Sequence, residues 1–418
     1  MTNQHFDLVI IGGGPAGLMA AGVAAECGAK VVLLEKNERP GKKLLISGKG
    51  RCNITTAETD PATIIESFGK NGKFLYSAFH KFSVQDTIDF FNQRGVATKV
   101  ERGQRIFPVS DRASDVLQAL VDWLKEKKVK IITNCAVHKL VTKGKAIEKV
   151  KTSQGDFSAN KFVVTTGGKA APSTGSSGDG YAWAGTLGHK IIDPQPSLVP
   201  VRTKESWAKD LEGLSLKNAR ISVYQHGKKR DERFGEAIFT HDGLSGPIIL
   251  DMSQKIGELL EHGEVELSLD FKPALEFPKL DSRIQRDWLA ISNKMFKNSL
   301  DKLLPQKLIP VAIKLSGIDP DKKVNAITKE ERNKLLHLLK EMTLKVRSLL
   351  GFERAIATAG GINLKEIEPK TMRSKLIKNL YFAGEIIDLN GPTGGFNLQM
   401  CWSTGYLAGK QAAETPVR

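Results

Sequence analysis

The first 35 residues carry the sequence pattern that most narrows the possible fold of this chain. The apolar run Phe6–Ile11 is followed by Gly-Gly-Gly-Pro-Ala-Gly at residues 12–17, by an alanine-rich stretch, and by a second apolar run that ends at Glu35. This order predicts a strand, a tight turn, a helix and a second strand, which is the arrangement that binds a dinucleotide. A bare Gly-x-Gly-x-x-Gly turn is common, but here the flanking strand, the helix and the terminal acid are all present.

Each glycine of the turn has its own expected role. Gly12 allows the sharp turn out of the first strand, Gly14 lets the backbone approach a pyrophosphate, and Gly17 lets the helix lie close to the sheet. The N–H groups at the start of the helix then face the phosphates. Glu35 is expected to bind the ribose hydroxyls of an adenosine, and an acid at this position favours FAD or NAD over NADP.

Length and composition place the chain among soluble proteins with more than one domain. It has 418 residues, of which 40% are apolar and 26% charged. It shows no signal-peptide pattern and no apolar run of the roughly 18 residues that a membrane span needs, so we expect a cytoplasmic protein without a membrane partner. Its four cysteines form no Cys-x-x-Cys pair, so neither a metal site nor a disulfide framework is expected.

The net charge of +16 is unevenly distributed along the chain. Residues 271–350 carry 17 Lys and Arg against 9 Asp and Glu. Helices are expected in this stretch at 281–303, 306–316 and 329–340. Its cations are either the solvated faces of these helices or a surface that binds a polyanion, and the sequence leaves both readings open.

A second basic cluster follows the first nucleotide-binding strands and consists of Lys36, Arg39, Lys42, Lys43, Lys49 and Arg51. Part of it lies in residues 41–55, GKKLLISGKGRCNIT, which are too rich in glycine and charge for a regular element. We expect a loop in which the lysines and Arg51 face phosphates and the glycines permit close backbone approach. Ser47, Asn53 and Thr55 could form hydrogen bonds to a flavin ring edge or a substrate. Cys52 is either a small core residue or a proton donor or nucleophile.

The middle of the chain predicts a change of architecture. Helices are expected at 83–94 and 111–127, the second capped by Ser110 or Asp111, and a short helix near 181–187 capped by Asp179. Three prolines within residues 194–200 then mark a domain boundary.

Beyond that boundary the pattern is one of short strands and turns, as at 219–225 and 264–270, which indicates an antiparallel barrel or sandwich. His241 lies in the turn-rich run 235–247, next to a Thr and an Asp. It is either a structural loop histidine or a proton donor.

The C-terminal segment predicts a second contribution to the same ligand. An expected strand over 380–385 ends in Gly384-Glu385, and Gly-Pro-Thr-Gly-Gly-Phe-Asn at residues 391–397 precedes an expected helix over 398–413. An acid after a strand can bind ribityl hydroxyls. The start of the helix can direct N–H groups and its positive dipole at the N1–O2 edge of a flavin.

Together these motifs resemble the two-dinucleotide-binding-domain flavoproteins, and more closely the BaiN/RdsA-like bacterial family of NAD(P)/FAD-dependent oxidoreductases, also called the aminoacetone oxidase family. The resemblance covers nearly the whole chain. Its carriers are residues 12–17, 47–53, 166–168, 239–247, 384–385 and 394–397. It implies an α/β fold with a discontinuous Rossmann-like FAD-binding domain, an inserted antiparallel β-barrel domain and a helical subdomain. The implied ranges are 1–193 with 355–418, 194–272 with 342–354, and 273–341.

The residues expected to bind FAD come from all these segments, and the family resemblance adds Val137, whose backbone would lie near the adenine. They are Gly12, Gly14, Pro15, Ala16, Gly17, Glu35, Lys36, Lys43, Ser47, Gly48, Gly50, Arg51, Cys52, Asn53, Val137, Thr166, Gly167, Gly168, Gly384, Glu385, Gly395, Phe396 and Asn397. Cys52 and His241 are the candidate catalytic residues, each as a donor of the proton that accompanies a hydride transfer.

Three functions fit these observations. The first is an FAD oxidoreductase that is reduced by NADH or NADPH and passes hydride to an activated C=C or C=N bond. Its favoured substrate is uridine of ribosomal RNA, with dihydrouridine as product, because of the basic segments. The second is a flavin oxidase or reductase for a small aminoketone or steroid-like molecule, and the third is a non-catalytic, FAD-carrying RNA-binding protein. No second nicotinamide-binding glycine motif is visible, and the sequence does not give the oligomeric state.

Overall fold

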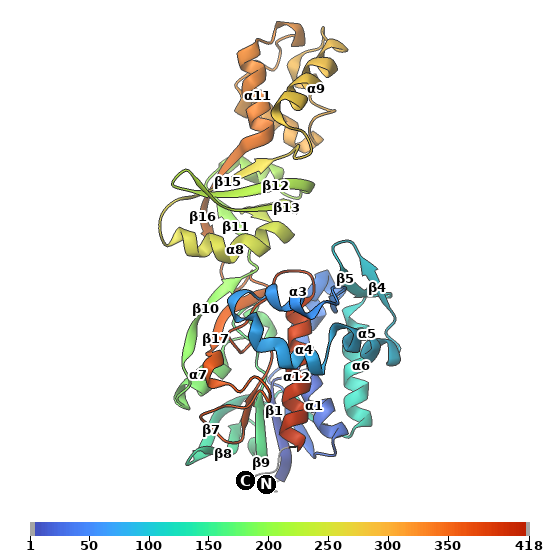
Figure 1. The fold of residues 1–418 in the computed structure, drawn as a ribbon, viewed down its shortest axis with the longest axis vertical. Coiled ribbons are helices and arrows are strands. Elements are labelled where there is room, and N and C mark those ends of the chain that lie inside the picture. The colour runs from blue at the N-terminus through green and yellow to red at the C-terminus, as the bar shows by residue number, and fades with distance from the viewer. Residues whose placement is uncertain (1–4, 415–418) are drawn as a thin grey trace. The chain divides into compact units, whose positions relative to one another are not determined.

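The computed structural model describes residues 5–414 and is drawn in Figure 1. The chain forms two compact units. The first unit consists of residues 1–197 and 352–418, and the second unit of residues 198–351. The boundaries expected from the sequence lie within four residues of these positions. The further division of the second unit into a barrel domain and a helical insert stays a prediction.

The first unit is built around a sheet whose strand order is β6-β2-β1-β9-β8-β7, with β18 also paired to β9. At its centre β1 (His5–Ile11) pairs in parallel with β2 (Val31–Leu34) and with β9 (Gly155–Val164), and β18 (Leu380–Phe382) pairs in parallel with β9. The other strands are β6 (Lys130–Ile132), β7 (Val137–Lys143) and β8 (Ala146–Thr152). Strands from both ends of the chain therefore lie in one sheet, and the apolar residues of β1, β2 and β18 are buried, as is usual for parallel sheets.

Two helices from opposite ends of the chain pack closely beside this sheet (Figure 1). They are α1 (Pro15–Glu26) and α12 (Phe396–Glu414). A Cβ atom at Gly405 would lie 2.4 Å from the carbonyl oxygen of Ala16, and one at Gly409 would lie 2.3 Å from that of Ala20. The two helix backbones can approach this closely only because both positions are glycine.

Smaller elements surround the sheet and the two helices. They are α2 (Lys42–Ile46), α3 (Pro61–Glu66), α4 (Tyr76–Lys81), α5 (Val84–Gln93), α6 (Ala113–Glu126), α7 (Asp179–Thr186), β3 (Thr55–Thr56), β4 (Thr98–Glu101), β5 (Arg105–Pro108), β10 (Ile191–Ser197) and β17 (Ala357–Ile362). The expected helices at 83–94 and 111–127 are confirmed as α5 and α6. The capping residues expected for α6 are wrong, because Arg112 holds the N-cap position and Asp111, in a left-handed conformation with φ of 55°, pairs with Lys99.

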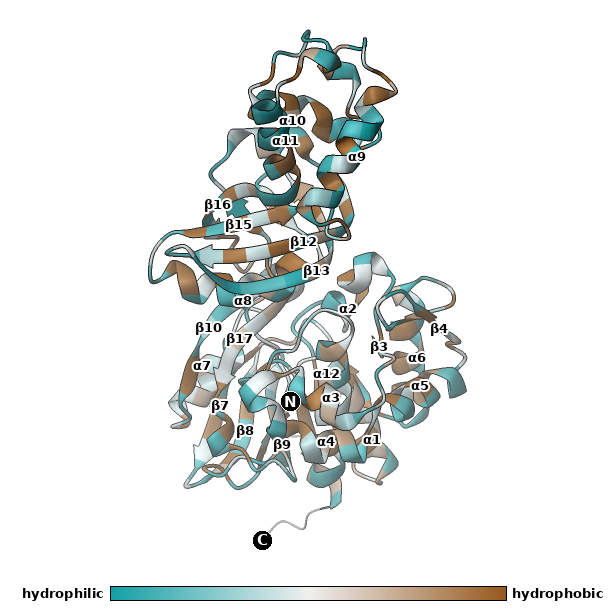
Figure 2. Cartoon of the chain, turned by 45° about the horizontal axis from the view of Figure 1, so that its top comes forward, coloured by the Kyte–Doolittle hydropathy of each residue, from teal (hydrophilic) through white to brown (hydrophobic). Residues whose placement is uncertain are grey.

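The second unit contains a closed antiparallel barrel with the strand order β11-β14-β13-β12-β15-β16, which confirms the expected barrel. Its strands are β11 (Val201–Thr203), β12 (Ser215–Gln225), β13 (Lys228–Thr240), β14 (Gly243–Ser245), β15 (Val265–Asp270) and β16 (Met342–Leu349), and α8 (Pro247–Leu260) follows β14. Apolar and polar residues alternate along these strands, as Figure 2 shows for β15, because only one face of each strand reaches the barrel core.

The remainder of the second unit is helical, with α9 (Phe277–Leu289), α10 (Ile309–Ser316) and α11 (Lys329–Glu341). The expected helix over 281–303 is too long, since α9 ends at Leu289 and turns with short 3₁₀ segments follow. Ser and Asn residues at 292–293 and 298–299 favour turns over helix. Leu300 and Leu303 fold back into the same core as α9. Their apolar side chains therefore extend the helical pattern in the sequence although the helix itself has ended. Among residues 5–414, no helix has the length and apolarity to cross a membrane.

The contact between α1 and α12 makes a direct prediction. Gly409→Ala should lower the free energy of unfolding by about 1–3 kcal/mol, because the added methyl group meets backbone that cannot move aside. Gly185→Ala in α7 is the matched control, since a Cβ there meets no atom within 4 Å and should leave stability equal or slightly higher. Urea unfolding measures both. Equal midpoints for the two variants would contradict the close packing of α12 on α1.

Candidate functional site

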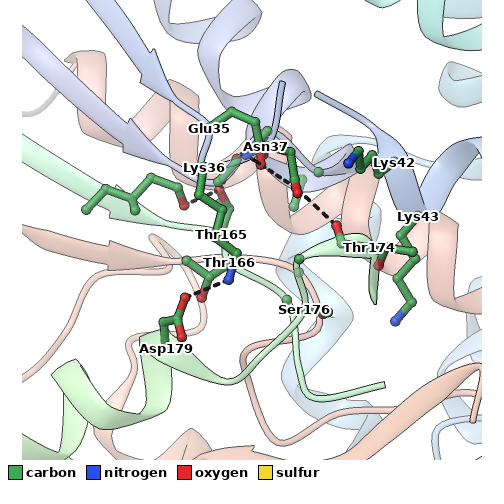
Figure 3. A pocket seen from close by; sticks show the side chains of 18 of the residues that line it. Glu35, Lys36, Asn37, Lys42, Lys43, Thr165, Thr166, Thr174, Ser176 and Asp179 are labelled. Atoms are coloured by element: carbon green, nitrogen blue, oxygen red, sulfur yellow. Dashed lines mark hydrogen bonds and ion pairs between the residues drawn. The ribbon is translucent and has the colours of Figure 1, made fainter. Parts of the chain in front are cut away.

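A pocket opens in the first unit beside the carboxyl ends of β1, β2 and β9, the edge at which parallel sheets bind ligands (Figure 3). About 870 Å³ of space lies between its walls, part of it open to solvent. Its walls come from the glycine turn, the end of β2, the segment after β9, α7, and the segment after β18.

The glycine turn forms the start of α1 and one wall of this pocket. Gly12 has φ of +106°, and a Cβ there would lie 2.7 Å from the carbonyl oxygen of Thr165. A Cβ at Gly17 would lie 1.9 Å from the carbonyl oxygen of Gly12, so both residues are required by the packing of the turn itself. Gly14 differs, because its φ of −76° suits any residue and a Cβ there would meet only one atom, 4.0 Å away. The protein's own packing gives no reason for glycine at this position, whereas a ligand at the helix N-terminus does.

Glu35 lies at the end of β2 with its carboxylate held at the pocket wall. It is 7% exposed. Oε2 accepts a hydrogen bond of 2.7 Å from the N–H of Gly13, and Oε1 accepts bonds from the backbone and side-chain nitrogens of Asn37. These donors fix the carboxylate at the place where an adenosine ribose is expected. Sequence reasoning missed Asn37, because no spacing rule distinguishes it from other loop residues.

The next residue, Lys36, forms an ion pair with an acid of α7. Its ammonium nitrogen lies 2.7 Å from Oδ2 of Asp179, as the close-up in Figure 3 shows, and it also donates to Ser177. Asp179 was expected to cap α7, and this is wrong because Gly178 holds the N-cap position and no side chain caps the helix. The pair instead ties the loop after β2 to the first turn of α7.

Lys43 and Glu385 form a second ion pair at the pocket. The Lys43 ammonium lies 2.7 Å from Oε2 of Glu385, while Oε1 of Glu385 accepts from the N–H of Thr358. The N–H of the preceding Gly384 donates to Oγ1 of Thr404 in α12. A residue from the N-terminal quarter of the chain and one from its C-terminal tail thus meet at one wall.

Not every residue expected to bind the cofactor lines this pocket. Those that do are Gly12, Gly14, Pro15, Ala16, Glu35, Lys36, Lys43, Val137, Thr166, Gly167, Gly384 and Glu385. Those outside its lining are Gly17, Ser47, Gly48, Gly50, Arg51, Cys52, Asn53, Gly168, Gly395, Phe396 and Asn397. Thr165, Thr174, Ser176 and Trp183 line it without having been expected, since they come from segments whose approach only the folded chain brings about.

Arg51 is committed to protein carboxylates, contrary to the expectation that it faces phosphates. Its guanidinium donates to Glu101 at 2.9 and 3.2 Å and to Asp111 at 3.2 Å, and it lies 4.0 Å from the centre of the Phe107 ring. Lys99 bridges the same two carboxylates. This network fastens the 47–53 segment to the β4–β5 hairpin. Residues 41–55, expected to be an irregular loop, contain α2 and a short 3₁₀ helix over Ser47–Gly50.

The 47–55 segment also docks onto the start of α12. Trp402 Nε1 donates to the carbonyl oxygen of Ile54 at 3.0 Å, and Thr55 Oγ1 donates to Oε1 of Gln399 at 2.7 Å. A Cβ at Gly395 would lie 2.3 Å from the backbone of Thr55, so glycine is needed there. The side chain of Asn397 bonds the backbone of Gly391, so that it braces the preceding loop.

Two buried polar atoms in these segments have no hydrogen-bond partner within residues 5–414. They are Oγ1 of Thr166 and Oδ1 of Asn53. Buried polar atoms are almost always bonded, so an unpaired one indicates a polar partner outside the protein chain. Thr166 lines the pocket and Asn53 does not. The free hydroxyl of Thr166 and the open space at Gly14 fit a dinucleotide bound in the pocket.

The two candidate catalytic residues lie in very different surroundings. Cys52 is fully buried, and burial raises the pKa of its thiol to about 12. Its environment is that of a core residue, which argues against a nucleophile. His241 lies in the turn between β13 and β14 of the second unit, its side chain is 68% exposed, and Nδ1 lies 3.4 Å from Oε2 of Glu212. A catalytic role for either residue stays a prediction.

The parallel sheet, the glycine turn with its open helix N-terminus and the acids after β2 and β18 define a dinucleotide-binding flavoprotein of the Rossmann type. The chain belongs to the HI0933-like family, because the family model for the HI0933-like protein Rossmann domain matches residues 6–411. This confirms the resemblance to the BaiN/RdsA-like flavoproteins. The protein is an enzyme, an FAD-dependent oxidoreductase, so the non-catalytic alternative is without support.

Two characterised relatives match over almost the whole chain. A 3-dehydro-bile acid delta(4,6)-reductase of Clostridium scindens is 33% identical over 97% of this chain and 99% of its own length. A ribosomal RNA dihydrouridine synthase of Escherichia coli is 28% identical over 96% of this chain and 97% of its own length. Among solved structures, a 3-ketosteroid-delta4-(5alpha)-dehydrogenase from Rhodococcus jostii matches with a TM-score of 0.57 at 16% identity, covering 99% of this chain and 98% of that one. At this identity the similarity shows a shared fold and nothing about function.

The open space at Gly14 predicts a variant that folds but does not bind the cofactor. Gly14→Val should leave the unfolding free energy of the apoprotein within about 1 kcal/mol of the parent, since neither φ nor a neighbouring atom opposes it. Added FAD at 100 times its Kd should stabilise the parent by about 2.7 kcal/mol and the variant by far less. Thermal unfolding with and without FAD tests this. Equal stabilisation of both proteins would show that the pyrophosphate does not lie at Gly14.

The burial of Cys52 predicts an unreactive thiol. With a pKa of about 12, about one thiol in ten thousand is ionised at pH 8, and the side chain is closed to solvent. Iodoacetamide should therefore label the exposed Cys27 in the native protein and leave Cys52 unlabelled, as read by peptide mass spectrometry. Urea-unfolded protein should be labelled at both. Native labelling of Cys52 at the rate of Cys27 would restore it as a candidate nucleophile.

Proposed function

We propose that this protein is a cytoplasmic FAD-dependent reductase that uses NADH or NADPH to saturate a carbon–carbon double bond conjugated to a carbonyl group, with uridine in ribosomal RNA as the favoured substrate. The observation that carries the proposal is the full-length match to two relatives whose names both describe the reduction of such a bond. Saturating the C5–C6 bond of uridine gives dihydrouridine, and a delta(4,6)-reductase saturates ring double bonds of a 3-oxo compound.

The first unit would hold FAD along the pocket wall. The N–H groups at the start of α1 would bind the pyrophosphate, the carboxylate of Glu35 the adenosine ribose, and the backbone near Val137 the adenine. Glu385 and the N-terminus of α12 would face the ribityl chain and the ring. When bound, FAD supplies hydride transfer, and the protein supplies placement and electrostatics.

The two candidate substrates pose the same task for the protein. Both carry a C=C bond conjugated to C=O, so a hydride adds to the carbon remote from the carbonyl and a proton adds to the carbon beside it. The nicotinamide provides the two electrons, and an acid must provide the proton. Cys52 and His241 are the candidates from the sequence, and the burial of Cys52 weakens its case.

The distribution of charge supports an RNA substrate. The chain carries a net charge of +16, and half of this excess lies in residues 271–350. In the helical part of the second unit, Lys294, Lys302 and Lys314 are exposed, and none forms an ion pair with another residue of the described chain. Unpaired surface cations attract phosphate groups, whereas a small steroid-like substrate gives no reason for several of them on one surface.

A steroid-like enone is the second candidate substrate. It is favoured by the higher identity to the bile acid reductase, at 33% against 28% for the RNA-modifying relative. Under this alternative the basic surface contributes to solubility alone. The two substrates share the FAD site, so they are distinguished by products and not by the cofactor.

The proposal predicts a change in ribosomal RNA. Deleting the gene should remove dihydrouridine from one position of that RNA, and a plasmid carrying the parent gene should restore it while the Gly14→Val gene does not. Nucleoside mass spectrometry measures both. Unchanged dihydrouridine together with NAD(P)H-dependent reduction of a 3-oxo-4-ene steroid by the purified enzyme would establish the second candidate and overturn the first.

A further inference from the structure

A row of exposed side chains runs along the segment between α3 and α5 in the first unit. This segment is a 3₁₀ helix over Gly69–Leu75 that continues into α4. In a 3₁₀ helix, residues three apart lie directly above one another, so Lys70, Lys73 and Tyr76 share one line. His80 follows Tyr76 by four residues in α4 and lies on the same side. We call these four residues the Tyr76 face.

The four side chains of the Tyr76 face are exposed to solvent. Tyr76 is 66% exposed, and Lys70, Lys73 and His80 are exposed as well. None of the four side chains forms a hydrogen bond or an ion pair with any other described residue. The stretch from 67 to 85 contains no Asp or Glu. One acid from elsewhere in the chain, Asp388, interacts electrostatically with Lys70, so the unopposed cation beside the aromatic ring is Lys73.

The inner side of the same segment is bound to the loop that leads into α12. The Phe68 ring lies edge-on to the Phe396 ring at 6.4 Å between centroids, and a Cβ at Gly391 would lie 2.8 Å from the Phe68 ring. Asn71 Nδ2 donates to the backbone oxygen and to Oδ2 of Asp388, both at 3.2 Å. The Tyr76 face is thereby fixed beside the end of the site where the flavin ring would bind, and α4 lies next to α12 in Figure 1.

An exposed tyrosine next to a row of exposed lysines has a recognisable chemistry. Unpaired bases stack on aromatic side chains, and neighbouring cations neutralise the adjoining phosphates. A buried ring or a lysine row alone would not give this combination. Double-stranded RNA offers no free base face, so the pattern favours a single strand.

We propose that the Tyr76 face binds single-stranded RNA, with Tyr76 stacking on an unpaired base next to the target uridine and Lys70 and Lys73 contacting the adjoining phosphates. The inference rests on the proposed function and specifies the surface that would present RNA to the flavin site. A reductase must reach a base that is out of its helix, and a stacking residue beside the site holds the strand in that state.

The test measures binding separately from turnover. A fluorescent, uridine-containing, single-stranded RNA of twelve nucleotides is titrated with the FAD-loaded enzyme, and anisotropy gives Kd at several salt concentrations. Tyr76→Ala should raise Kd by about 5- to 150-fold, whereas Tyr76→Phe, which keeps the ring, should stay within about twofold of the parent. Lys70→Ala and Lys73→Ala should each reduce the slope of log Kd against log salt by about 0.7.

Lys139→Ala is the matched control, because Lys139 is an exposed lysine of β7 with no ion-pair partner in the described structure. It should leave Kd unchanged. All variants should retain the parent's FAD content and unfolding temperature, since the altered side chains are exposed. A Tyr76→Ala variant that binds as the parent does, a Lys139→Ala effect equal to that of Lys73→Ala, or a parent that does not bind RNA would each overturn the inference.

Measuring dihydrouridine in cells that carry the same variants separates this inference from the proposed function. If the parent forms dihydrouridine and Tyr76→Ala forms it equally well with unchanged Kd, the inference fails while the proposed function stands. If RNA binding depends on Tyr76 but no dihydrouridine depends on the gene, the binding surface stands while the substrate assignment fails.

Discussion

The contact between α1 and α12 is the interaction on which the rest of the first unit depends. Gly405 and Gly409 allow the backbone of α12 to touch that of α1 at Ala16 and Ala20. Because α1 begins in the glycine turn, this contact places the C-terminal helix against the helix that starts at the pocket. The pairing of β18 with β9 does the same within the sheet. The two ends of the chain form one site because their helices and their strands are each packed together.

The site is also notable for how its charges are balanced. Two cations expected to face phosphates are instead paired with carboxylates, Lys43 with Glu385 and Arg51 with Glu101, and Lys36, expected to bind the cofactor, is paired with Asp179. A phosphate in the pocket would therefore be bound chiefly by backbone N–H groups at the start of α1, which carry only partial charge. Cations left without partners lie on outer surfaces, where they can attract a polyanion without competing for the cofactor.

The order of elements and the nucleotide motif could be predicted because both depend on local sequence. The apolar run before Gly12 and the acid at Glu35 indicate the βαβ unit, and the short strands and turns that follow the proline-rich boundary indicate an antiparallel barrel or sandwich. Predictions failed where a contact between distant segments overrode a rule based on local sequence. The α9 helix ends early although the apolar periodicity continues, since Leu300 returns to the same core from a turn. Asp179 was expected to cap a helix, but an ion-pair partner on another segment was available to it.

The sequence by itself determined the class of ligand, because the steric needs of a dinucleotide turn can be met only by glycine at fixed spacing and those residues are contiguous. It also determined that two distant segments serve that ligand. Only the tertiary structure decided which side chains are free to act. Whether Arg51 faces a ligand or Glu101, and whether Cys52 is reactive or buried, depends on partners that lie far away in the sequence. Burial and pairing energies arise between segments, so they become defined only when the chain has folded.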